Sequence, residues 1–145
     1  MKKTVPFELF GANQYLMFDI QRLDEFEKKT GTSILTLTQK DDYGFAFALD
    51  ALPIAMKQHY FGLTRDQWSE KIAGYIENGN DGAGGDISEI TRPLVMAIWL
   101  SGMLGKNFQQ IADSIVNKTT LPTDEVTEEP KNGKKAKPAR ALPIG

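Results

Sequence analysis

Residues 64–79 read TRDQWSEKIAGYIENG, and this stretch predicts one complete helix together with both of its ends. Thr64, with Gln67 three positions later, matches a capping box, in which the two side chains bond backbone N–H groups at the start of a helix. Apolar residues then recur at helical spacing on one face, namely Trp68, Ile72, Tyr75 and Ile76. Asn78-Gly79 supplies a helix stop. The stretch therefore favours a helical fold.

Two further helical patterns precede it. Asp19 can cap a helix that Gly31 ends, with Ile20, Leu23 and Phe26 at helical spacing between them. From Asp41 or Asp42 a second pattern runs to about Tyr60, and Pro53 should kink it or divide it in two. Between these patterns, residues 33–38 are rich in β-branched side chains and are compatible with either a strand or a helix.

The N-terminal residues have a different period. Val5, Phe7 and Leu9 alternate with other residues, Gly11-Ala12-Asn13 offers turn chemistry, and an apolar run returns at residues 15–18. We expect a short β-hairpin, with Pro6 confining its strand to an edge.

Beyond residue 79 the pattern is helical again after a glycine-rich loop at residues 79–85. Asp86-Ile87-Ser88-Glu89 repeats the capping-box logic and opens a long helix to about Leu104, perturbed near Pro93 and ended by Gly105. A last helix is expected from about Asn107 to Asn117. The predicted fold class is thus mainly α, a small helical domain over residues 1–117 with a short N-terminal β-hairpin.

Residues 118–145 form a segment of different composition. It holds four prolines, no aromatic residue and few aliphatic ones, so we expect a disordered tail that cannot bury enough surface to order itself. Five basic residues fall in its last sixteen positions with no acid among them: Lys131, Lys134, Lys135, Lys137 and Arg140. The net charge of −2 hides this split between an acidic body and a basic end.

Residue patterns for catalysis are scarce. The chain has no cysteine, and its one histidine, His59, stands near Tyr60 and Phe61 without a nucleophile motif, which favours a packing role. The loop at residues 79–85 lacks the lysine of a phosphate-binding loop and the ligand spacing of a calcium loop. We therefore expect no enzyme, no cofactor and no metal.

The stretch from Leu94 to Leu104 is almost wholly apolar. Eleven helical residues rise about 16 Å, roughly half the hydrocarbon thickness of a bilayer, so we expect no membrane span. Either this helix is central to the bundle, or another protein covers one side of it. For the second case the candidate partner contacts are Trp68, Leu94, Trp99, Leu100, Met103 and Phe108.

The order of these parts resembles a known family. A hairpin leads into Asp19–Gly31, helices follow around residues 45–60 and 64–76, and Asp86–Ile90 precedes Ala97–Met103. Residues 5 to 105 are in this respect similar to the tail assembly chaperones of long-tailed phages and gene transfer agents. The loop at residues 79–85 and the prolines at 53 and 93 have no counterpart in that pattern.

The resemblance implies a function. Such chaperones form homo-oligomers in the host cytoplasm, bind the tape measure protein and keep it soluble until the tail tube polymerises. Many have a longer form, made by ribosomal frameshifting, that recruits the tail tube protein. Here Gly133-Lys134-Lys135 could be encoded by a slippery run of adenines, which a sequence such as AAG-AAG in the gene would exclude.

An alternative class is a small regulatory or nucleic-acid-binding helical protein whose basic tail touches phosphates. The tail has no interleaved aromatic residues for stacking on bases, so nucleic-acid binding would be non-specific and salt-sensitive. We therefore do not expect nucleic acid as the main partner.

Overall fold

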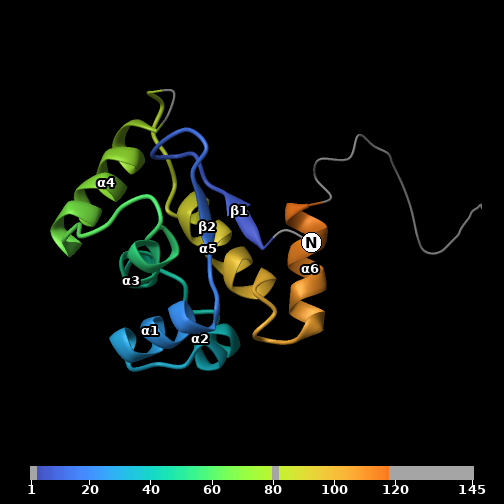
Figure 1. Ribbon diagram of the computed structural model, residues 1–145. Helices are drawn as coiled ribbons and strands as arrows, with labels where there is room; N and C mark the ends of the chain where they lie inside the picture. The colour runs from blue at the N-terminus through green and yellow to red at the C-terminus, as the bar shows by residue number, and fades with distance from the viewer. Residues whose placement is uncertain (1–2, 80–81, 118–145) are drawn as a thin grey trace, which may run out of the picture. The chain divides into compact units, whose positions relative to one another are not determined.

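The computed structural model describes residues 3–79 and 82–117, and they form a mainly helical protein with a short N-terminal hairpin (Figure 1). The predicted fold class is therefore confirmed. One compact unit spans Met1–Asp113, and of the chain after it residues 114–117 are described. The predicted disordered basic tail, residues 118–145, lies outside the described residues.

The hairpin consists of β1 (Thr4–Pro6) and β2 (Tyr15–Met17), paired antiparallel with Val5 opposite Leu16. Both of these side chains are buried. Pro6 lies opposite Tyr15 at the end of β1, and its missing N–H suits an edge strand. Beyond it the Phe7 N–H donates to the Gln14 carbonyl at 2.9 Å and closes the loop. The predicted hairpin is confirmed.

Helix α1 (Ile20–Thr30) has the two ends that were predicted. The Asp19 carboxylate accepts a hydrogen bond from the Arg22 N–H at 2.8 Å, which caps the first turn. Gly31 adopts a left-handed φ of 72° and donates its N–H to the Glu27 carbonyl, which ends the helix. Leu23 and Phe26 are buried on its inner face.

The ambiguous β-branched stretch forms helix α2 (Ile34–Lys40). Ser33 caps it by accepting a hydrogen bond from the Thr36 N–H at 3.1 Å. Asp41 then takes a left-handed φ of 54° and ends α2. The next helix was predicted to begin at Asp41 or Asp42, and this is wrong, because it begins after Gly44, which has an extended backbone.

Helix α3 (Phe45–Ala55) has more buried residues than α1 or α2. Pro53 lies in its last turn, where it removes one N–H from the helix ladder. The helix ends two residues later, and turns follow in which the N–H groups of His59 and Tyr60 both donate to the Met56 carbonyl. The predicted extension of this helix to Tyr60 is therefore wrong.

Helix α4 (Arg65–Asn78) begins with the capping box predicted at Thr64 and Gln67, which is therefore confirmed. The Gln67 N–H donates to Thr64 Oγ1 at 3.1 Å, and the Thr64 N–H donates to Gln67 Oε1 at 2.8 Å. The glycine-rich segment after the helix has neither helix nor strand in its described part. Gly85 faces the Tyr75 ring so closely that an added Cβ would lie 2.3 Å from a ring carbon.

Helix α5 (Ser88–Leu100) is shorter than predicted. Ser101 Oγ donates to the Ile98 carbonyl at 2.5 Å, and Gly102 has a left-handed φ of 86°, so the chain leaves the helix four residues before Leu104. Pro93 is accommodated inside α5. Helix α6 (Lys106–Val116) follows and agrees with the predicted last helix.

The core forms where α3 and α5 contact each other. Helices α1 and α4 pack against α3, and both strands of the hairpin pack against α5. Large side chains from each of these elements are almost fully buried there, including Leu16, Phe26, Leu52, Trp68 and Leu94.

Candidate functional site

Three of the six predicted partner contacts belong to the core of the chain itself. Trp68 is 1% exposed, and Leu94 and Leu100 are 0% exposed. Trp68 lies against the rings of Phe10 and Tyr60, with centroid distances of 6.3 and 5.6 Å. These three side chains therefore offer almost no exposed surface to a partner in this structure. The hairpin and α3 pack against α5, and most apolar residues of α5 are buried, which favours the core interpretation of this helix.

The other three lie nearer the surface. Trp99 and Phe108 are half-buried and pack on each other, with ring centroids 4.8 Å apart. This contact joins the last turn of α5 to the first turn of α6. Met103, in the connection between those helices, is 49% exposed. Of the six candidates, Met103 is the residue best placed to touch another molecule.

Met103 forms part of an apolar groove of about 330 Å³. Ile20 at the start of α1 is 68% exposed, and Leu35 in α2 is 56% exposed, and both line the same groove. Leu23, Ile34 and Leu104 also line it, and the first two are buried. We call this feature the α1–α2 groove. Ile20 and Leu35 are functional candidates that the sequence analysis missed.

The α1–α2 groove contains a large share of the exposed apolar surface. Within the described residues, seven large apolar side chains are about half exposed or more: Ile20, Leu35, Phe45, Phe61, Met103, Ile111 and Ile115. Three of the seven line this one groove. Isolated exposed apolar residues are ordinary, but a group that shares a concave surface is typical of an interaction site.

The groove has a defined shape because its two helical walls are tied together. Glu27 Oε2 accepts a hydrogen bond from the Ile34 N–H at 2.8 Å, which fastens the first turn of α2 to α1. Ser33 satisfies a second N–H of that turn. The groove is therefore held by capping interactions as well as by packing.

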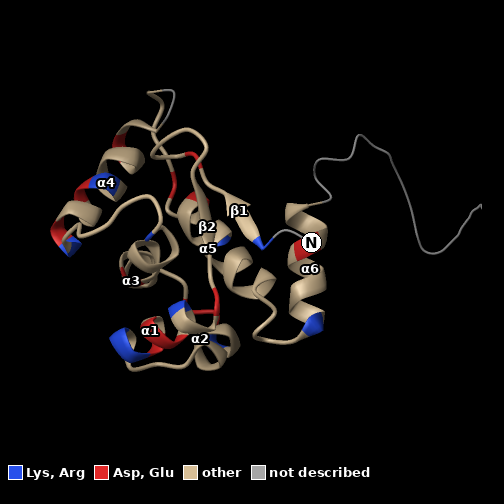
Figure 2. Ribbon diagram, in the orientation of Figure 1, with Lys and Arg blue, Asp and Glu red and all other residues tan. Residues whose placement is uncertain are grey.

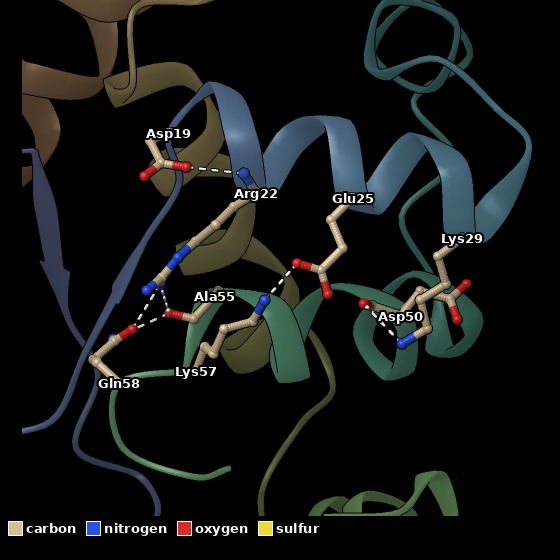
Figure 3. Close-up of polar contacts among 8 residues, drawn as sticks. All are labelled: Asp19, Arg22, Glu25, Lys29, Asp50, Ala55, Lys57 and Gln58. Carbon is tan, nitrogen blue, oxygen red and sulfur yellow. Dashed lines mark hydrogen bonds and ion pairs between the residues drawn. The ribbon is translucent and has the colours of Figure 1, made fainter. Parts of the chain in front are cut away.

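Polar contacts also hold α1 against α3, as Figure 3 shows. Arg22 donates to Gln58 Oε1 at 2.6 Å and to the Ala55 carbonyl at 3.4 Å. Further along α1, Lys57 pairs with Glu25, and Lys29 donates to the Asp50 carbonyl at 3.4 Å. Two basic side chains of α1 are thus directed toward α3.

The groove face of α1 carries acids instead. Asp24 and Glu27 line the groove, and no lysine or arginine is among the described residues that line it. Figure 2 shows acidic and basic residues side by side along α1. Lys28 pairs with Asp24 at 3.1 Å, but both side chains are more than half exposed, so the pair is weak.

The one histidine has a packing role, as the sequence analysis favoured. His59 Nε2 accepts a hydrogen bond from the Tyr15 N–H at 3.1 Å, and the two rings meet edge to face at 4.7 Å. These contacts tie the turn after α3 to the hairpin.

Among residues 3–79 and 82–117, no group of three or more acidic, histidine or cysteine side chains is arranged to hold a metal ion. Within the same residues, no helix combines the length and the hydropathy that crossing a bilayer requires.

Among the described residues, Tyr43 has a displaced pKa. Burial raises the pKa of the Tyr43 phenol above its ordinary value of 10.0, and the negative charge of Asp41 acts in the same direction. The hydroxyls of Tyr43 and Thr38 lie 3.1 Å apart, and a hydrogen bond that Thr38 donates to the phenolate opposes the increase. Tyr43 lines a separate hollow beside α5, so this shift does not concern the α1–α2 groove.

Comparisons of this chain with protein-family models, with curated proteins and with solved structures find no match.

Proposed function

We propose that this chain is an assembly chaperone that covers an apolar helical face of another protein. The observation that carries the proposal is the α1–α2 groove, in which Ile20, Leu35 and Met103 are all about half exposed or more. A groove between helices is a common receptor for the apolar face of an amphipathic helix.

The resemblance of residues 5 to 105 to tail assembly chaperones supplies the proposed client, a tape measure protein. In this proposal the chaperone keeps the client soluble in the bacterial cytoplasm until tail tube subunits polymerise around it. The order of a hairpin, a capped α1 and later helices is compatible with that resemblance.

The size of the groove suits reversible binding. Covering one half-exposed aliphatic side chain contributes about 1 kcal/mol, so three of them support only a weak complex. Several copies along one long client would hold it by multivalency, and a better-matched partner could still displace them. We propose a homo-oligomer for this reason.

Recruitment of the tail tube protein is proposed for a longer, frameshifted form. The lysine codons concerned lie in the segment beyond residue 117, outside the described residues.

Co-expression with the tape measure protein tests the proposal. We expect the wild-type chain to keep that protein in the soluble fraction, and Leu35→Glu to abolish this effect by placing a charge in the groove. Phe61→Glu is the matched control, because Phe61 is 90% exposed and does not line the groove. Equal solubility with wild type and Leu35→Glu would contradict the proposal.

DNA binding by the purified chain distinguishes a chaperone from the alternative class, a nucleic-acid-binding protein. Binding to random duplex DNA that falls steeply between low and moderate salt, and disappears when residues 130–145 are deleted, would favour a nucleic-acid-binding protein.

A further inference from the structure

Four residues of α1 define the polarity of the α1–α2 groove. Ile20, Leu23, Asp24 and Glu27 follow the i, i+3, i+4, i+7 spacing of a single helix face, and all four line the groove. The face is apolar at its N-terminal end and acidic toward its C-terminal end. An occupant therefore meets apolar side chains and carboxylates together.

The two carboxylates have little local compensation. Glu27 uses Oε2 for the Ile34 N–H, and no other polar contact of its carboxylate is found among the described residues. Asp24 pairs with Lys28, whose side chain is 78% exposed, so this ammonium can move away at little cost. The basic residues Arg22 and Lys29 are engaged on the α3 side of the helix.

We infer that the α1–α2 groove selects a client helix whose apolar stripe is bordered by lysine or arginine. The apolar stripe covers Ile20, Leu35 and Met103, and the basic border faces Asp24 and Glu27. This inference rests on the proposed function and adds the charge of the client segment to it. Charge complementarity of this kind sets specificity and association rate more than total affinity.

Two labelled peptides of about 18 residues, or five helical turns, test the inference with the full chain. Both place leucines on one helix face, and their flanking positions are lysine in one and glutamate in the other. Fluorescence anisotropy should show about fivefold tighter binding of the lysine peptide, as two partly exposed ion pairs allow. The preference should shrink as salt is raised.

Four variants test whether residues of the groove cause the tighter binding of the lysine peptide. Asp24→Asn should reduce it to about twofold, since one of the two carboxylates is lost, and Lys28→Gln should increase it by releasing Asp24. Glu70→Gln, an exposed change on α4, should leave it unchanged. Leu35→Glu should abolish binding of both peptides. We choose Asp24 for this test because Glu27 also holds the start of α2.

The outcomes separate the two proposals. Equal binding of both peptides, tighter binding of the glutamate peptide, no binding of either, or an Asp24→Asn variant with the full preference would overturn the inference. The chaperone proposal is tested separately, by the solubility of the client in the presence of Leu35→Glu. If that variant fails to keep the client soluble, the chaperone proposal holds whatever the two peptides show.

Discussion

The carboxylate of Glu27 accepts a hydrogen bond from the backbone N–H of Ile34, with Oε2 and the nitrogen 2.8 Å apart. The N–H belongs to the first residue of α2 and has no partner inside that helix. One side chain of α1 thus holds the start of α2, which Ser33 also caps, and both helices line the α1–α2 groove.

Removing this carboxylate should loosen α2. We expect Glu27→Ala to lower the free energy of unfolding by about 1–2 kcal/mol, since a charge-assisted hydrogen bond to a partly buried N–H is lost. Glu27→Gln keeps an acceptor and should lose less. Urea unfolding followed by circular dichroism measures both, and a Glu27→Ala variant as stable as wild type would show that the bond contributes nothing.

Trp68 and Met103 should behave oppositely, although both were predicted to touch a partner. Trp68 is 1% exposed, so Trp68→Ala should lose about 3–5 kcal/mol of stability through the cavity it leaves. Met103 is 49% exposed, and Met103→Ala should change stability by no more than about 0.5 kcal/mol. Chemical denaturation of the two variants, with Trp68→Phe as a milder change if Trp68→Ala fails to fold, checks the core assignment.

The same glycine-to-alanine change should have opposite signs at two positions. Gly31 has a φ of 72°, so Gly31→Ala is strained and should cost about 1 kcal/mol although no atom lies within 4 Å of the added Cβ. Gly74 lies inside α4 with equally open space, so Gly74→Ala should add about 0.5–1 kcal/mol by helix propensity. In thermal unfolding, a stabilising Gly31→Ala would contradict the assigned end of α1, and a destabilising Gly74→Ala would contradict the open space at that position of α4.

Tyr43 should make stability depend on pH in the alkaline range. Because burial raises its pKa above 10.0, the folded protein holds the phenolic proton more tightly than the unfolded chain does. The stabilisation is complete below the unfolded pKa and is lost as the pH rises through the folded pKa. Unfolding free energies measured on either side of pH 10 should fall more for wild type than for Tyr43→Phe, and parallel curves would exclude this role.

The sequence predicted correctly those helix ends that depend on residues close by in the chain. The caps at Asp19 and Thr64 and the stop at Gly31 depend on neighbours within a few residues, so the sequence shows them directly. Helix ends that depend on a backbone conformation were misplaced. Asp41 has a left-handed φ, so no helix begins there. The Ser101 Oγ hydrogen bond and the left-handed φ of Gly102 end α5 before Leu104, although the sequence stays apolar to that point.

The candidate site was harder to predict than the fold. The most apolar stretch suggested the partner contacts, but its residues Leu94 and Leu100 are buried in the core, where the hairpin and α3 pack against α5. Ile20 and Leu35 were overlooked because each lies in the first turn of a short helix, where the sequence pattern shows an ordinary apolar position. Their common groove lies where α1 and α2 meet, joined by the Glu27–Ile34 hydrogen bond, and periodicity does not reveal such contacts between separate helices.

The most direct test of the account uses the absence of cysteine from this chain, which makes any introduced thiol unique. Leu35→Cys places one thiol in the α1–α2 groove, and Phe61→Cys places another on exposed surface outside it. Alkylation rates are measured for both variants with and without tape measure protein. We expect the client to slow alkylation at position 35 severalfold and to leave position 61 unchanged. Protection at position 61 with none at position 35 would contradict the claim that the groove holds the client.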